Sequence, residues 1–169
     1  VQERLGSGDL RSIQSRSRYR LPFILAGLYR RYQDARNVRD KYAYAIAFTE
    51  GVFRFFAYIN ISNVIAVEGM SDQTLESIQS LLHGSIGRFV QVNHWAYKKL
   101  KSSSGLLFCP EFDELFKSEA WKRAQNELPA LRNRYAHGSL VVSDDDKYRE
   151  LEPIVVELTR HIQWLNEYR

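Results

Sequence analysis

Cysteine and proline are scarce in this chain of 169 residues, and each shortage narrows the classes of structure that the chain can adopt. The single cysteine, Cys109, cannot form an intrachain disulfide, which excludes a disulfide-stapled scaffold and suits a reducing compartment. Because Cys109 stands beside Pro110, we interpret it as a small packed side chain rather than a nucleophile. Only four prolines and nine glycines interrupt the chain, so the sequence permits long helices.

Long apolar runs are also missing from the sequence. No stretch reaches the roughly 18 apolar residues of a membrane-spanning helix, and no secretory signal is visible at the start. We therefore predict a cytoplasmic protein without a membrane partner. The chain begins with Val rather than Met. We interpret it as a domain of a longer protein, whose other domains would be its partners, with a processed protein as the alternative.

Motifs for several kinds of chemistry are absent as well. The sequence has no Walker-type phosphate loop, no Gly-x-Ser-x-Gly elbow and no His-Glu-x-x-His. A single cysteine excludes a cysteine-pair zinc site, and the carboxylates show no metal-ligand spacing. The acidic run 144–146 is better explained as the start of a helix than as a cation site. We expect no metal and no cofactor, and we disfavour phosphoryl transfer, zinc hydrolysis and serine hydrolysis.

Aromatic and basic residues are plentiful. Hydrophobic residues make up 44% of the chain and aromatic residues 13%, which is enough for a bulky core. The net charge of +4 and the pI of about 9.2 fit an anionic partner without requiring one. One basic group lies in residues 1–20, and a second begins at Arg30 and Arg31. Solvated side chains explain both groups most simply, and the other interpretation is that Arg30 and Arg31 bind RNA.

Apolar residues recur at steps of three and four through most of the chain, which predicts helices. Residues 1–19 lack the pattern and are expected to be a flexible basic arm or linker, followed by one helical domain over 20–169. The expected helices cover 21–34, 38–61, 72–101, 118–128 and 130–137, and a last helix follows 144–146. The third is expected to be interrupted near Gly84 and Gly87, and Pro129 is expected to separate the fourth from the fifth. In the last helix, Pro153 predicts a kink or a later start. Residues 106–118 are expected to be irregular, and 140–142 is the longest strand-like run. Four or five such amphipathic helices predict an all-α, up-and-down bundle.

One segment, residues 131–138, combines side chains with recognisable chemistry: Leu-Arg-Asn-Arg-Tyr-Ala-His-Gly. Metal-free RNA cleavage can use an arginine to hold a phosphate, a histidine to move a proton and an asparagine to orient either one. On an ideal helix Arg132 and His137 lie about 140° apart, whereas Asn133 and His137 share a face. Gly138 predicts that the helix ends there. The simplest alternative is a histidine stabilised by a helix C-terminus beside solvated arginines.

Arg132-Asn133-x-x-x-His137 resembles the Arg-x(4–6)-His motif of the HEPN superfamily, in the form with Asn after the Arg. HEPN domains are all-α bundles of four or five helices with this motif near a late helix, which is the order expected for this chain. The segment 21–31 and the aromatic-rich helix after it also look like HEPN-like domains fused to large bacterial sensor and defence proteins. The resemblance extends over about residues 20–168.

The resemblance implies a metal-independent endoribonuclease of a toxin or antiviral-defence system, which acts as a homodimer with its motifs facing each other. By analogy, Arg132 would hold the scissile phosphate and stabilise its charge in the transition state. His137 would transfer a proton at the 2′-hydroxyl or the leaving oxygen, and Asn133 would orient His137 or the phosphate. The products would carry a 2′,3′-cyclic phosphate and a 5′-hydroxyl, and Arg134 would add an RNA contact.

Two other interpretations stay open. Many HEPN-like domains serve, without cleavage, as dimerisation, interaction or sensor modules of larger proteins. A catalytic domain should expose Arg132 and His137 in one groove, whereas a module can bury His137 or pair Arg132 with a carboxylate such as Glu127. The remaining interpretation is passive RNA binding through the arginine-rich arm, which predicts a strong dependence on salt.

Overall fold

A computed structural model describes residues 21–82, 84–103, 110–137 and 142–167, and for 134–137 it describes the backbone alone. Every regular element in these residues is helical. The elements are α2 (Phe23–Asp34), α3 (Val38–Glu68), α4 (Asp72–Leu82), α5 (Ile86–Ser103), α6 (Glu111–Lys117), α7 (Glu119–His137), α8 (Asp144–His161) and the 3-10 helix η1 (Gln163–Glu167). The predicted arm 1–19, Cys109, Gly138 and most of the strand-like run 140–142 lie outside these residues.

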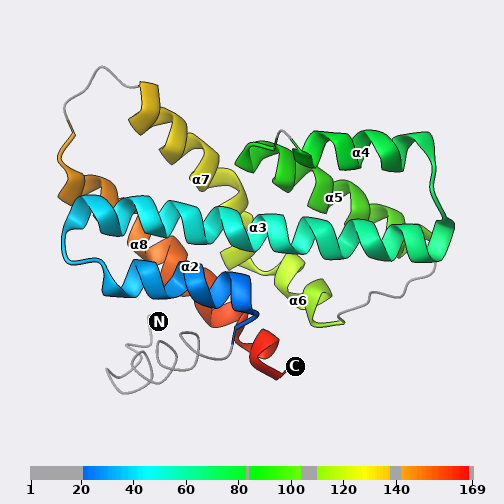
Figure 1. Ribbon diagram of the computed structural model, residues 1–169, viewed down its shortest axis with the longest axis horizontal. Coiled ribbons are helices and arrows are strands. Elements are labelled where there is room, and N and C mark those ends of the chain that lie inside the picture. The colour runs from blue at the N-terminus through cyan, green and yellow to red at the C-terminus, as the bar shows by residue number, and fades with distance from the viewer. Residues whose placement is uncertain (1–20, 83, 104–109, 138–141, 168–169) are drawn as a thin grey trace.

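The long helix α3 is the centre of the fold, and α2, α5 and α8 pack on it (Figure 1). α3 is buried on several sides because its apolar residues form a band wider than one stripe, and Phe48, Phe53 and Phe56 are all fully buried. The predicted all-α bundle is therefore confirmed, although the described residues form seven α-helices rather than the four or five expected. α3 also continues past its predicted end near Ile61, because Val64 is buried as well, and it ends before Gly69, which has a φ of 81°.

Aromatic rings join α3 to α6 and α7. The ring of Phe56 stacks on Phe112 of α6 with centroids 4.8 Å apart, and Phe53 lies 4.5 Å from Trp121 of α7. Phe112 and Leu115 are both buried, at the spacing of one helical turn. The prediction of irregular structure over 106–118 is thus wrong for residues 111–117, because contact with this aromatic core stabilises a helix of only seven residues.

The predicted helix boundary at Pro129 is wrong, and so is a later start at Pro153, which was one of the two alternatives expected there. α7 continues through Pro129, and the same buried face runs on both sides of it. That face consists of Trp121, Ala124, Leu128 and Leu131. α8 begins at Asp144 rather than after Pro153, because the Ser143 hydroxyl caps it by accepting a hydrogen bond of 3.1 Å from the Asp146 backbone N–H. In both helices, buried side chains beyond the proline offset the cost of its missing backbone hydrogen bond.

The predicted interruption near Gly84 is confirmed, since α4 ends at Leu82 and α5 begins at Ile86. A Cβ atom at Gly84 would stand 2.5 Å from the Phe89 ring, so this turn requires glycine. Ser71 caps the start of α4, because its Oγ accepts a hydrogen bond of 3.2 Å from the Thr74 backbone N–H.

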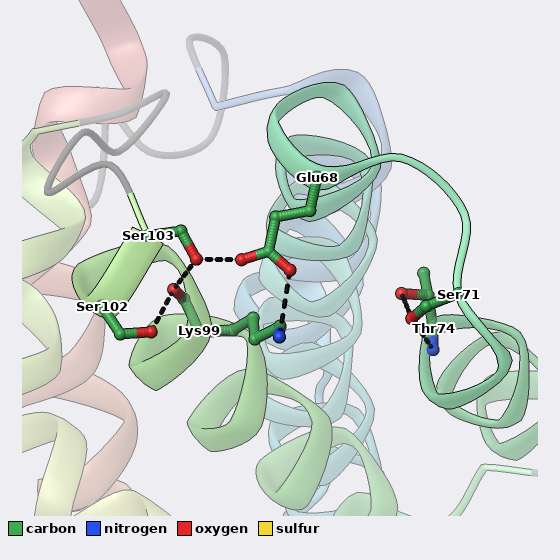
Figure 2. Close-up of polar contacts among 6 residues, drawn as sticks. All are labelled: Glu68, Ser71, Thr74, Lys99, Ser102 and Ser103. Carbon is green, nitrogen blue, oxygen red and sulfur yellow. Dashed lines mark hydrogen bonds and ion pairs between the residues drawn. The ribbon is translucent and has the colours of Figure 1, made fainter.

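A polar cluster fastens the C-terminal end of α3 to that of α5 (Figure 2). One oxygen of the Glu68 carboxylate lies 3.1 Å from the Lys99 ammonium, and the other accepts a hydrogen bond from the Ser103 hydroxyl. The hydrogen bond from Ser103, followed by the one from Lys99, lowers the pKa of Glu68 below its ordinary value.

Candidate functional site

The motif Arg132-Asn133-x-x-x-His137 lies in the last two turns of α7. Leu128 and Leu131 are buried, which fixes that face of the helix against the bundle. Arg132 and Asn133 follow on the open side, and both side chains are exposed. Figure 1 shows this end of α7 at the edge of the molecule, on the opposite side of α3 from α2. The local sequence thus presents two of the three predicted catalytic residues to solvent.

Arg132 has one ionic partner among the described residues, Glu50 of α3. The Arg132 Nε and the Glu50 Oε1 atoms are 3.6 Å apart, and the two side chains are 44% and 22% exposed. This distance is too long for a good hydrogen bond, and an exposed ion pair of this kind contributes about 0–1 kcal/mol. Glu50 therefore holds the guanidinium near α3 without preventing it from binding a phosphate.

A noncatalytic module could pair Arg132 with a carboxylate such as Glu127, but the carboxylate beside Arg132 in the described residues is Glu50. Glu127 instead accepts a hydrogen bond of 3.1 Å from Arg123, one turn earlier on α7. Glu50 stands 82 positions before Arg132 in the chain, so no local pattern connects the two. The one sequence feature that could have indicated this contact is that Glu50 is a lone carboxylate within the apolar stretch of α3, where a charged side chain requires a partner.

The backbone of α7 stays helical as far as His137, its last residue. Positions 132 and 137 therefore lie about 140° apart around the helix axis, as in an ideal helix, and positions 133 and 137 share a face. The helix neither ends nor is interrupted between them, so α7 does not by itself bring Arg132 and His137 to one face. The side chains of Arg134 and His137 lie outside the described part of the structure.

The two other arginines predicted to bind RNA lie on α2. Arg31 is exposed, whereas Arg30 is half-buried and its Nε donates a hydrogen bond of 3.4 Å to the Ala26 carbonyl. Together with Arg36 they line a hollow at the turn between α2 and α3, which also contains Asp34 and Asp40. In Figure 1, α3 lies between α2 and the motif end of α7, so Arg30 and Arg31 do not join Arg132 in one site.

A hollow of about 400 Å³ lies beside the motif, between α7 and α8. Its lining is charged and of both signs, and includes Arg123, Glu127, Arg149 and Glu150. In the part of the chain that the structure describes, no three His, Cys, Asp or Glu residues are grouped so that they could share a metal ion. None of the helices described there is long and apolar enough to cross a bilayer.

Comparison with known proteins adds no relative: no family model matches the chain, and neither a curated protein nor a solved structure matches it. The features that bear on function are therefore the motif, its place in the helical bundle and the surroundings of Arg132.

Proposed function

We propose that this chain is a HEPN-type, metal-independent endoribonuclease domain of a cytoplasmic toxin or antiviral-defence protein. The observation that carries the proposal is the exposure of Arg132 and Asn133 at the end of a late helix in an all-α bundle, with His137 as the last residue of that helix. The surface around Arg132 offers an RNA phosphate a guanidinium whose only ionic contact in the described residues is loose.

The active site in this proposal is completed by a second copy of the chain. Because the backbone of α7 turns positions 132 and 137 to different faces, we infer that one protomer alone would not bring both groups to the same phosphate. A twofold axis beside the end of α7 would set the Arg132 of one copy opposite the His137 of the other. The homodimer is therefore a requirement of the proposed chemistry and not an addition to it.

The proposed reaction needs only the groups of the motif. The RNA 2′-hydroxyl attacks the adjacent phosphorus and loses its proton to His137, while Arg132 stabilises the negative charge on the phosphoryl oxygens. The bond between the phosphorus and the 5′-oxygen breaks, and the leaving oxygen takes a proton from the protonated His137, which yields a 2′,3′-cyclic phosphate and a 5′-hydroxyl. Asn133 shares a helix face with position 137 and would orient the histidine or the phosphate.

The test is cleavage of a mixed RNA substrate by the chain in EDTA, with analysis of the cut ends. We expect cyclic-phosphate ends from the wild type, and a loss of rate of about 100-fold or more in Arg132→Ala and in His137→Ala. Arg123→Ala and His161→Ala are matched controls, because each removes the same kind of side chain from an exposed position outside the motif. RNA that stays intact at high concentrations of a dimeric wild-type chain would refute the catalytic proposal.

A second candidate function, a noncatalytic interaction or sensor module, is favoured by one observation. Arg132 lies beside a carboxylate, Glu50, as expected of a structural arginine. In that case Glu50→Gln and Arg132→Gln should lower the free energy of unfolding by similar amounts, at most about 1 kcal/mol, and neither should change RNA binding. In the catalytic case Glu50→Gln should strengthen RNA binding, because it removes the charge that competes with the phosphate for Arg132.

A further inference from the structure

An apolar groove runs between the first half of α2 and the middle of α3, away from the motif. Its volume is about 560 Å³. A second hollow, of about 400 Å³, continues it along α3 as far as Ala66, and the two share Tyr58 and Ile59. We call the two together the α2–α3 groove. The main lining residues are Phe23, Ile24, Gly27, Leu28, Phe55 and Tyr58.

The groove is open because of glycine. A Cβ atom placed on Gly27 would meet nothing within 4 Å, so the missing side chain leaves a hollow on the surface of α2. Beneath it, a Cβ at Gly51 would stand 2.5 Å from a methyl group of Leu28, so glycine lets α2 approach α3 closely. Large apolar side chains are left uncovered at one end: Phe23 is 87% exposed and Ile24 64%. Adjacent uncovered apolar side chains beside a hollow are typical of a protein-binding surface.

Among the described residues, every charged side chain that lines the groove is positive. Arg31 and Arg54 line it, and no carboxylate is among the described residues of the lining. The Arg54 guanidinium lies 4.9 Å from the centre of the Phe89 ring, a cation–π contact that holds it in position. Among the described residues, neither arginine forms an ion pair with a carboxylate. An occupant of this groove therefore needs apolar side chains for its floor and negative charge at its edge.

We propose that the α2–α3 groove binds an acidic amphipathic helix of another protein or domain. The groove follows α3 from Gly51 to Ala66, about 22 Å, which matches a helix of about four turns. Such a helix would insert apolar anchors at positions i, i+3 or i+4, and i+7. Its carboxylates would lie beside Arg31 and Arg54. This binding site does not depend on the ribonuclease proposal, because neither Arg132 nor Asn133 lines the groove.

Two other possible occupants, the N-terminal segment of this chain and a second copy of the chain, are less complementary to the positive charge of the groove. The segment 1–20 carries five arginines against two carboxylates, so it would add positive charge next to Arg31 and Arg54. A second copy, seated groove to groove about a twofold axis, would bring four arginines of this face together, and like charges in an interface are unfavourable.

The test uses two designed helical peptides of 16 residues and the whole chain, with binding followed by fluorescence anisotropy. Both peptides carry leucine at i, i+3, i+4 and i+7, and their flanking positions are glutamate in one and lysine in the other. We expect the glutamate peptide to bind at least about tenfold more tightly than the lysine peptide. Equal affinities, or no binding of the glutamate peptide at about 100 µM, would overturn the proposal.

Two variants locate the binding site. The Cβ of Gly27→Leu would meet nothing within 4 Å and the leucine would project into the hollow, so the protein should fold and lose at least about tenfold in affinity for the glutamate peptide. Arg54→Glu should abolish the preference between the two peptides, because it leaves one positive and one negative side chain at the groove. Leu82→Ala and Arg88→Glu, both exposed positions outside the groove, should leave binding unchanged. A wild-type dimer that Gly27→Leu converts to a monomer would instead assign the groove to a second copy and refute the acidic-helix proposal.

Discussion

At the scale of single residues, the carboxylate of Asp113 is surrounded by a hydroxyl group and two ammonium groups. It accepts a hydrogen bond of 2.5 Å from the Tyr97 hydroxyl and one of 2.7 Å from the Lys117 ammonium. Lys101 lies 3.5 Å away. The hydrogen bond from Lys117 first, and then that from Tyr97, lower the pKa of Asp113 to about 2. This carboxylate thus ties α6 to the C-terminal part of α5.

We predict that Asp113 makes the protein sensitive to acid. Its pKa is near 4 in an unfolded chain and about 2 in the folded one. Its contribution to the free energy of unfolding is therefore fully present above about pH 4 and is lost as the pH falls towards 2. Urea unfolding at pH 5 and pH 2.5 should show a smaller difference for Asp113→Asn than for the wild type. Glu114→Gln, on the exposed side of α6, is the control, and the idea fails if both variants match the wild type.

At the scale of elements, a buried amide pair joins α3 to α5. Asn93 is fully buried, and its amide nitrogen donates to the carbonyls of Phe53 and Phe89, at 2.8 and 2.9 Å. Its amide oxygen accepts a hydrogen bond of 3.0 Å from Asn60, which is also buried. The side chain of Asn93 therefore has hydrogen-bond partners for both its nitrogen and its oxygen, and it also provides the partner of the buried Asn60 amide. These bonds fix the position of α5 against α3.

We predict that Asn93→Leu lowers the free energy of unfolding by about 2–4 kcal/mol, because it leaves the Asn60 amide buried without a partner. Asn60→Leu should cost a comparable amount for the same reason. The double variant should cost clearly less than the sum of the two, since it removes both polar groups together. Chemical denaturation of the four proteins gives the coupling free energy. Additive costs would show that the two amides act independently.

The same elements show what the sequence can and cannot predict. Repeated apolar spacing was sufficient for α2, for the start of α3 and for the break between α4 and α5, because each depends on local pattern or on a glycine. The helix at 111–117 and the continuity of α7 through Pro129 were not predicted, since both depend on burial against distant residues such as Phe56. The motif at 132–137 could likewise be predicted from the sequence, because it is a local pattern. The contact of Arg132 with Glu50 could not be predicted, because it joins residues that are far apart in the chain.

At the scale of the whole molecule, α3 is the scaffold that both proposed surfaces share. Glu50 lies beside Arg132 on one side of this helix, and the next residue, Gly51, lines the α2–α3 groove on another. Consecutive residues on a helix point about 100° apart, so the two surfaces are neighbours that face different directions. Arg31 is the one residue assigned to both, as an RNA contact predicted from the sequence and as part of the groove.

This overlap leads to a prediction that separates the two roles. A saturating amount of the glutamate peptide should raise the KM for RNA about threefold to tenfold, because it covers Arg31, and should leave kcat unchanged, because it does not reach Arg132. Steady-state cleavage with and without the peptide measures both constants, and the lysine peptide is the control. An unchanged KM would remove Arg31 from the RNA-binding residues. A changed kcat would contradict separate surfaces, because it would mean that α3 transmits occupation of the groove to the motif.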